Sequence, residues 1–243
     1  MTTDTPRLAT ATGSTEVWRV GYRPEPWAWP SWQYATDGRF PGRWDDADGN
    51  FRTIYAGNQL LSCLLEVLAC FRPDPDLAAQ LTDIVEYDND DNENDGDAGA
   101  YPTIQVGAVP RSWLEPRTAA SARLNGTYAA VTNAESVAFL RPVFLTRSYE
   151  LGLDDLDTAA LKNARPRTLT QQVATYIYES TELDGVQFLS RHGDDHTLWA
   201  IFERPDDPDI SPHLHDLVHH DLTPDMPQIL EAFRIHHLDW ADD

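Results

Sequence analysis

Lysine is almost absent from this chain of 243 residues, because Lys162 is the only one and the other 17 of the 18 basic residues are arginines. Acidic residues number 40, which gives a formal net charge of −22. Proteins that bind nucleic acid or anionic membranes need a basic surface. The charge therefore argues against both functions, and taken alone it indicates no more than good solubility.

Cysteines are few, and long apolar runs are missing. Cys63 and Cys70 lie seven residues apart in one apolar stretch, and a helix would place them two turns apart, too far for a disulfide. No stretch approaches the roughly 18 apolar residues of a membrane span, and residues 1–13 lack the apolar segment of a secretory signal. We therefore expect reduced thiols, a cytoplasmic protein and no membrane partner.

Several common site motifs are also missing. The chain has no Gly-x-x-x-x-Gly-Lys phosphate loop, no Gly-x-Gly-x-x-Gly dinucleotide motif and no Gly-x-Ser-x-Gly nucleophile turn. Six of the eight histidines lie near the C-terminus, without the Cys or carboxylate spacing of a known metal site; they are His213, His215, His219, His220, His236 and His237. We therefore predict no metal site.

Hydrophobic patterning predicts one α+β domain. We expect strands over residues 17–22, 53–56, 81–87, about 104–109, 186–190 and 197–203. We expect helices from 57 or 58 to 71, over 135–140, 154–163 and 226–237, and one capped by Thr168 or Thr170. The predicted organisation is a flexible N-terminus (1–16), a domain (17–204) with an acidic loop (88–97), and a His- and Asp-rich C-terminal extension (205–243) packed on it.

The segment from Gln59 to Cys70 carries a single carboxylate. At about 100° per residue its leucines and Val67 form one apolar face, and Glu66 falls on the opposite side among small or polar residues. A face this bare can be approached closely by a ligand or another backbone. The alternative is an ordinary half-buried glutamate paired with an arginine.

Ser190 ends the expected strand 186–190, on the same face as Val186 and Phe188. Its hydroxyl could contact a ligand at the edge of a cleft, or it could only satisfy the backbone of the following turn. Alternation points the next residue, Arg191, the other way, where it could be structural.

Arginines interleaved with aromatic residues gather near the N-terminus, at positions 19, 23, 39 and 43. The guanidinium group offers a fork of donors that matches carboxylate or phosphate. In an acidic protein such arginines are also common as surface counter-charges, so both interpretations stay open.

Taken in order, these segments resemble the RES-domain family, named for an Arg, a Glu and a Ser. The family pattern is matched here by Trp18-Arg19, Gly42-Arg43-Trp44, Tyr55-Ala56, Glu66, and Asp184-Gly185 through Ser190. The resemblance spans about residues 17–204. The 124 positions between Glu66 and Ser190 and the extension after Pro205 are longer than in compact members.

The resemblance implies a fold similar to the ADP-ribosyltransferases, with mixed or antiparallel sheets flanked by helices. Studied members are NAD-degrading toxins that cleave the nicotinamide–ribose bond, by phosphorolysis in the best-described cases, and pair with an antitoxin. It therefore implies NAD as substrate, inorganic phosphate as co-substrate, no prosthetic group, and a cognate antitoxin as a possible partner. The alternatives are an NAD glycohydrolase, an ADP-ribosyltransferase or a non-catalytic nucleotide-binding protein. The oligomeric state stays open.

The resemblance also implies roles for individual residues. Glu66 would hold the ribose 2′-hydroxyl and stabilise the developing cation, with Arg43 and Ser190 as the other catalytic residues. Arg19 and Arg43 would bind the pyrophosphate or an incoming phosphate, Tyr55 would pack against nicotinamide or ribose, and Ser190 would hydrogen-bond the ribose or phosphate. Arg39 and Arg191 are further candidates for substrate binding.

Overall fold

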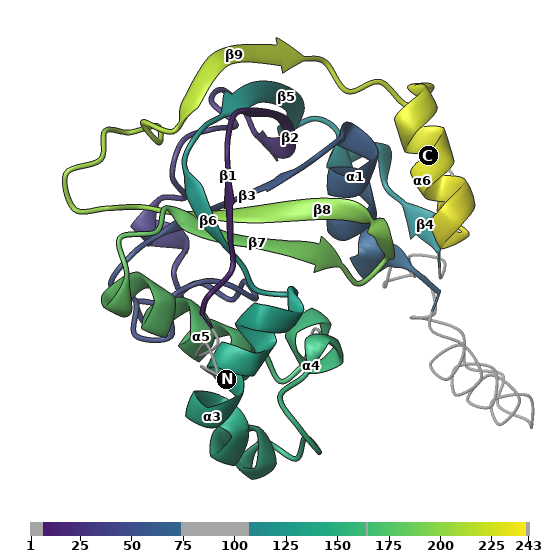
Figure 1. Ribbon diagram of the computed structural model, residues 1–243. Helices are drawn as coiled ribbons and strands as arrows, with labels where there is room; N and C mark the ends of the chain where they lie inside the picture. The colour runs from purple at the N-terminus through teal and green to yellow at the C-terminus, as the bar shows by residue number, and fades with distance from the viewer. Residues whose placement is uncertain (1–6, 74–106, 164, 242–243) are drawn as a thin grey trace, which may run out of the picture.

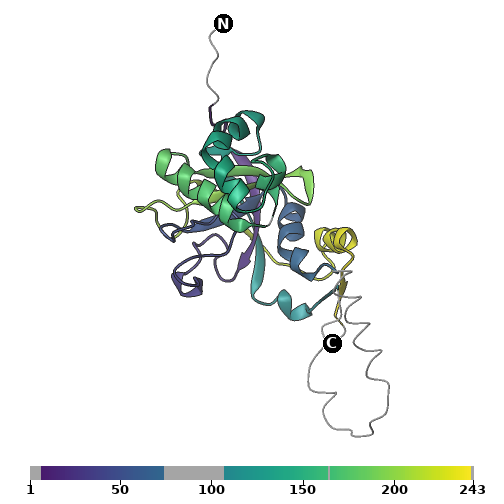
Figure 2. The ribbon, with the colours of Figure 1, turned by 90° about the horizontal axis from the view of Figure 1, so that it is seen from below.

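A computed structural model describes residues 7–73, 107–163 and 165–241. One large mixed sheet runs through the centre of the molecule, and its helices form two groups (Figure 1). The first group comprises α3, α4 and α5, and the second comprises α1 and α6 (Figure 2). This α+β arrangement confirms the predicted fold class.

Eight strands form the main sheet in the described residues, in the order β1-β6-β7-β8-β3-β2-β5-β9. All neighbouring pairs are antiparallel except β6 and β7, which are parallel. The strands are β1 (Thr10–Thr12), β2 (Thr15–Tyr22), β3 (Thr53–Gly57), β5 (Arg117–Leu124), β6 (Thr127–Ala130), β7 (Gly185–Ser190), β8 (Gly193–Phe202) and β9 (Leu214–His220). A separate pair joins β4 (Ala108–Val109) in parallel to β10 (Asp239–Trp240).

The helices pack on the sheet or on one another through buried apolar residues. They are α1 (Leu60–Leu68), α3 (Ala134–Glu150), α4 (Thr158–Lys162), α5 (Arg167–Ser180) and α6 (Pro227–His236), with short 3₁₀ turns at Trp32–Tyr34, Ala69–Phe71 and Arg111–Trp113. On α5 the spacing of Leu169, Val173 and Ile177 places all three in the core, as the sequence predicts.

Two clusters of buried side chains explain where the helix groups sit. Phe188 of β7 and Leu198 of β8 belong to a core shared with α3, α4 and α5. Leu64 of α1 and Phe233 of α6 belong to a second core, which Ala119 of β5 also joins. The candidate site residues lie between these two groups of helices.

Several predicted element bounds are wrong. Helix α3 extends to Glu150, well past the predicted end, and α4 begins at Thr158 with Asp157 as its N-cap. Neither Thr168 nor Thr170 caps α5: Pro166 is the N-cap residue, and the Thr170 hydroxyl donates instead to the carbonyl of Arg167. Strands β5, β6 and β9 were not expected, because their short or polar side chains give weak alternation.

Segments near both ends of the chain belong to the sheet. Strand β1, within the segment expected to be flexible, pairs with β6. Strand β9, within the predicted extension, pairs with β5, and α6 packs on α1. The predicted domain bounds remain predictions, but these contacts show that residues 205–243 contribute to the sheet and the core.

Two predictions lie wholly outside the described residues, namely the strand over 81–87 and the acidic loop over 88–97. The strand predicted near 104–109 is described only from residue 107, where β4 covers Ala108–Val109. The part of the chain that the structure describes contains no helix long and apolar enough to cross a membrane.

Candidate active site

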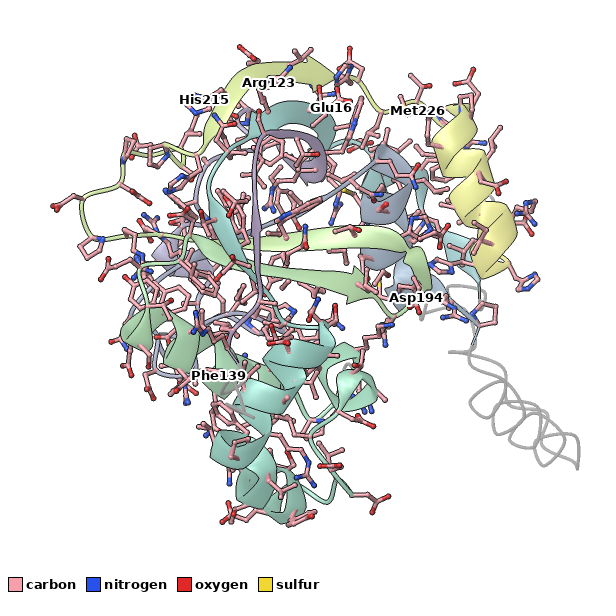
Figure 3. All side chains as sticks on the ribbon, viewed as in Figure 1. Glu16, Arg123, Phe139, Asp194, His215 and Met226 are labelled. Atoms are coloured by element: carbon pink, nitrogen blue, oxygen red, sulfur yellow. The ribbon has the colours of Figure 1, made fainter. Side chains whose placement is uncertain are left out.

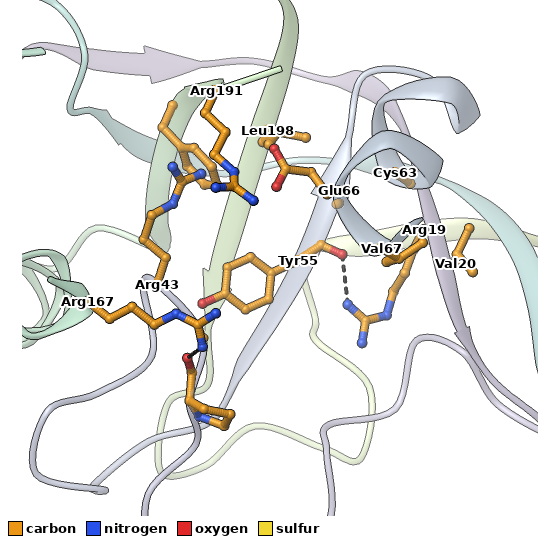
Figure 4. Close-up of a pocket in the computed structure, with 14 residues that line it drawn as sticks. Arg19, Val20, Arg43, Tyr55, Cys63, Glu66, Val67, Arg167, Arg191 and Leu198 are labelled. Atoms are coloured by element: carbon orange, nitrogen blue, oxygen red, sulfur yellow. Dashed lines mark hydrogen bonds between the residues drawn. The ribbon is translucent and has the colours of Figure 1, made fainter. Parts of the chain in front are cut away.

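A pocket of about 430 Å³ opens between the two groups of helices (Figure 4). This volume falls in the range typical of small-molecule sites. Its lining comes from helix α1, from strands β2, β3, β7 and β8, from the loop before β3 and from the start of α5. The lining residues are Arg19, Val20, Pro41, Gly42, Arg43, Tyr55, Ala56, Cys63, Glu66, Val67, Arg167, Phe188, Arg191 and Leu198.

Glu66 and Ser190 meet at this pocket, although 124 positions separate them in the sequence. The Ser190 hydroxyl donates a 2.7 Å hydrogen bond to Glu66 Oε1. It also accepts a 3.0 Å bond from the backbone N–H of His192, in the turn between β7 and β8. The second interpretation of Ser190 is confirmed, because its hydroxyl satisfies the turn. The hydroxyl also touches Glu66, but Ser190 is only 1% exposed and lies outside the pocket lining, so direct contact with a ligand stays a prediction.

Glu66 interacts with Arg43 at a distance but forms no direct ion pair with an arginine in the described structure. None of the ion pairs among the described residues joins Glu66 to a guanidinium. The structure therefore does not contain the ordinary Glu–Arg pair that was the alternative interpretation. Its side chain is 28% exposed, and the exposed part faces the pocket. The carboxylate is thus oriented by a neutral hydroxyl and remains accessible to a ligand.

Arg43 and Arg191 flank the same pocket (Figure 4). One Arg43 nitrogen donates to the backbone carbonyl of Lys162, and the guanidinium carbon lies 4.7 Å from the centre of the Phe188 ring. Burial lowers the pKa of Arg43, and the nearby Glu66 carboxylate partly opposes this shift. Arg43 is therefore held by the protein yet turned toward the site.

Arg19 lies farther along the pocket, beneath β3. Its Nε donates to the carbonyl of Pro26 at 2.7 Å, and its Nη1 donates to the carbonyl of Tyr55 at 2.8 Å. These two bonds fix the orientation of the Arg19 guanidinium group but leave further N–H donors available. Burial lowers the pKa of the Arg19 guanidinium. A group this firmly placed can bind an anion without first losing side-chain entropy.

Tyr55 connects the pocket to the loop that carries Arg43. Its hydroxyl donates to Asp45 Oδ1 at 2.9 Å and accepts from the backbone N–H of Trp44 at 2.8 Å, and Asp45 Oδ2 accepts from the N–H of Gly42. Burial, reinforced by Asp45, raises the pKa of Tyr55 well above its usual value, so the phenol stays protonated. Its ring forms part of the pocket wall.

The lining carries four arginines and one carboxylate, so the pocket favours an anionic ligand. Arg167, at the first position of α5, completes this set and donates to the carbonyl of Pro41. No sequence pattern singles out Arg167, because it follows a proline in a region without a recognised motif. Arg167 lines the pocket only because α5 begins next to the loop that carries Gly42 and Arg43.

Two other candidate residues behave differently from their predictions. Arg191 was expected to point away from the Ser190 face, but it lines the pocket, because the strand ends at Ser190 and alternation no longer applies in the turn. Arg39 lies outside the pocket lining: it is exposed, pairs by backbone bonds with Thr36 and donates to the carbonyl of Ala47.

The two cysteines are free thiols, as predicted. Cys63 lies at the pocket wall, where its thiol donates to the carbonyl of Trp18, and burial raises its pKa to about 12. This thiol is not a nucleophile at neutral pH. Among the described residues, no three His, Cys, Asp or Glu side chains are arranged to hold a metal ion.

Fold and pocket together define an α+β protein with a pocket in which four arginines surround one oriented carboxylate. Residues 16–126 match the family model described as the RES domain, which supports the resemblance found in the sequence. RES domains are associated in general with NAD-related toxin activity. The match includes Arg19, Arg43, Tyr55 and Glu66 and ends before Ser190, which the structure itself brings to Glu66.

No curated protein and no solved structure matches this chain.

Proposed function

We propose that this protein consumes NAD by cleaving the bond between nicotinamide and ribose, with inorganic phosphate as the acceptor. The observation that carries the proposal is a carboxylate, Glu66, oriented by Ser190 inside a pocket that otherwise presents arginines. One anionic group is thus positioned for a developing cation, and several cationic groups surround it for the phosphates.

The proposed chemistry needs only one carboxylate. Cleavage of a glycosidic bond develops oxocarbenium character on the ribose, and a fixed negative charge beside it stabilises the transition state. A phosphate oxygen forms the new bond to the ribose carbon while the carbon–nitrogen bond breaks. The electron pair of the broken carbon–nitrogen bond returns to the nicotinamide ring, so nicotinamide leaves as a neutral molecule. The other product is ADP-ribose 1-phosphate.

The four arginines support phosphate in preference to water. NAD brings a pyrophosphate, and Arg19, Arg43, Arg167 and Arg191 together offer more donors than a pyrophosphate alone would use. A water nucleophile would need a nearby general base and no added positive charge. Hydrolysis, transfer of ADP-ribose to a macromolecule, and NAD binding without turnover remain the competing functions.

Nicotinamide release from NAD, followed with and without phosphate, tests the proposal. We expect turnover that requires phosphate, a phosphorylated ADP-ribose product by ³¹P NMR, and a loss of about 100-fold or more in kcat for Glu66→Gln. The matched control is Glu16→Gln, an exposed glutamate on β2 (Figure 3), which should retain full activity.

Each competing function gives a distinct result in this assay. Free ADP-ribose at all phosphate concentrations would identify a glycohydrolase, and label retained on a protein or nucleic acid would identify a transferase. Binding of NAD without product, with Glu66→Gln equal to wild type, would contradict catalysis altogether. We also propose, from the family association alone, that a cognate antitoxin binds this protein, which co-purification from its native host would test.

A further inference from the structure

His192, in the turn after Ser190, has a buried nitrogen with no hydrogen-bond partner. The side chain is 4% exposed, and Nε2 makes no hydrogen bond within the described structure. Buried polar atoms are nearly always paired, because an unpaired one costs about 1–3 kcal/mol. The nitrogen faces Glu66, with 3.9 Å between Nε2 and Glu66 Oε2.

The position of His192 is determined from two sides. Its backbone N–H donates to the Ser190 hydroxyl, which in turn donates to the other carboxylate oxygen of Glu66. Its ring packs edge-on against the ring of His236, with 5.1 Å between ring centres and 68° between planes. A turn residue thus contacts both the site and the C-terminal helix α6.

His236 links α6 to the end of α1 that carries Glu66. It is 2% exposed, and its Nε2 lies 2.8 Å from the carbonyl of Leu65, the residue before Glu66. A carbonyl only accepts, so His236 Nε2 carries the proton and donates. This bond satisfies one of the carbonyls that a helix leaves free at its C-terminal end.

The surroundings keep His192 neutral. The pKa of His192 is lowered to about 3, although the Glu66 carboxylate faces it. The causes are burial, the guanidinium groups of Arg191, Arg72 and Arg43, and the adjacent His236. Arg191 belongs to the same turn, Arg72 follows α1, and Arg43 lies in the loop before β3. A neutral imidazole can donate a hydrogen bond without adding a cation next to the reacting ribose.

We propose that His192 is a positioning residue for Glu66: in the substrate complex its Nε2–H donates to Glu66 Oε2, while Ser190 continues to donate to Oε1. A closing movement of about 1 Å by either side chain brings Nε2 and Oε2 within hydrogen-bond distance. Helix α6 takes part in the site through His236, which fixes the His192 ring and the end of α1. This inference rests on the proposed role of Glu66 as the catalytic carboxylate.

Kinetics of four single variants test this role. His192→Leu removes the donor and should lower kcat for NAD at least 10-fold while changing KM less than 2-fold, because the carboxylate loses its orientation and the arginines remain. His192→Gln places an amide N–H near the position of Nε2 and should recover most of kcat. His236→Leu should resemble His192→Leu, and His215→Leu, an exposed histidine on β9 (Figure 3), should leave kcat unchanged.

A spectroscopic measurement tests the same proposal without turnover. Ring ¹⁵N spectra of the labelled protein should show His192, identified by its loss in His192→Gln, as a neutral ring with its proton on Nε2 between pH 5 and 8. With the NAD analogue carba-NAD, which keeps the phosphates but resists cleavage, this ¹Hε2 signal should move downfield in wild type and not in Glu66→Gln.

The two arms separate the possible failures. A proton on Nδ1, or a ¹Hε2 shift that is the same in Glu66→Gln, overturns the role of His192 even if NAD is consumed. Absence of NAD turnover in the wild type overturns the proposed function, and the spectra still decide whether His192 orients Glu66. If His192→Leu does not fold, equal kcat for His192→Gln and His192→Asn overturns the proposal, because only glutamine reaches the Nε2 position.

Discussion

Gly42 shows how a single residue determines the shape of the Arg43 loop. A Cβ built at this position would overlap both Asp45 Oδ2 and the Tyr55 hydroxyl. Both groups hold the loop, because Oδ2 accepts from the Gly42 N–H and the hydroxyl donates to Asp45 Oδ1. The close approach of the backbone, and not a special torsion angle, is what requires glycine here.

We predict that Gly42→Ala displaces the loop and lowers the free energy of unfolding by about 1–3 kcal/mol, as overpacking does. Because Arg43 moves with the loop, affinity for an anionic ligand should fall as well. Urea unfolding and calorimetric titration with NAD measure the two effects. Unchanged stability together with unchanged affinity would show that Asp45 and Tyr55 give way easily.

The pH dependence of stability follows from the buried histidines. The pKa of His192 is about 3 in the folded protein and near 6.5 when unfolded, and burial also lowers the pKa of His236. Below pH 6.5 the unfolded chain therefore binds more protons than the folded one, so these groups lower stability as the pH falls.

We predict that the free energy of unfolding decreases by an amount on the order of 1 kcal/mol between pH 7 and pH 5.5 through these groups. In His192→Gln the decrease should be smaller, since glutamine does not titrate. Urea titrations at several pH values provide the comparison. An equally steep decrease in His192→Gln and wild type would show that other groups control the acid response.

At the scale of elements, the ends of β3 and β8 are joined by a two-pronged ion pair between Arg52 and Glu203. Both side chains are largely shielded, with exposures of 21% and 16%. The Arg123–Asp216 pair between β5 and β9 offers a comparison, because its side chains are 56% and 76% exposed. Arg123 lies at the upper rim of the molecule in Figure 3.

We predict that Arg52→Ala lowers the free energy of unfolding by about 1–3 kcal/mol, because it leaves Glu203 partly buried without its partner. Arg123→Ala should change it by less than about 0.5 kcal/mol, since exposed pairs contribute little. Thermal unfolding of both variants gives the comparison, and equal effects would contradict the role of burial.

At the scale of the whole molecule, the C-terminal segment completes the fold. Helix α6 packs on α1, and Ile229, Ala232 and Phe233 are buried in the core shared by these helices. The segment from Pro205 onward nevertheless carries ten acidic residues and one arginine. Six of its eight described acidic residues are exposed, while its apolar face supports the helix that bears Glu66.

We predict that Phe233→Ala lowers the free energy of unfolding by about 3–5 kcal/mol, as the loss of a buried ring does. Leu230→Ala, on the same helix but at a position where leucine is 51% exposed, should have an effect below about 0.5 kcal/mol. Chemical denaturation compares the two. A small effect of Phe233→Ala would show that α6 is only loosely attached and would weaken its role in positioning Glu66.

The overall charge of −22 does not describe the pocket. Ten acidic residues lie between Asp74 and Asp97, and ten more lie from Pro205 to the end, so these two segments hold most of the net charge. The pocket lining in contrast carries four arginines and Glu66. An acidic protein can thus present a local site for an anion.

The sequence by itself determined the features that depend on near neighbours. The inward position of Ser190 and the core face of α5 follow from strand and helical periodicity. On α1 the predicted faces are correct only in part: Glu66 faces the pocket, but Val67, predicted on the apolar face, is 36% exposed and lines the pocket, and Ser62 is buried. Arg19, Glu66 and Ser190 were also predictable as a set, because they appear in the order that the family resemblance requires.

Only the tertiary structure decided which residues distant in sequence face one another. The Ser190–Glu66 bond depends on how α1 packs beside the β7–β8 hairpin, and periodicity carries no information about that packing. Arg167 enters the pocket and Arg39 stays outside it because of loop paths, and Arg191 faces inward because the strand ends one residue earlier. His192 and His236 meet behind Glu66 because α6, 170 positions away from it along the chain, folds back onto α1.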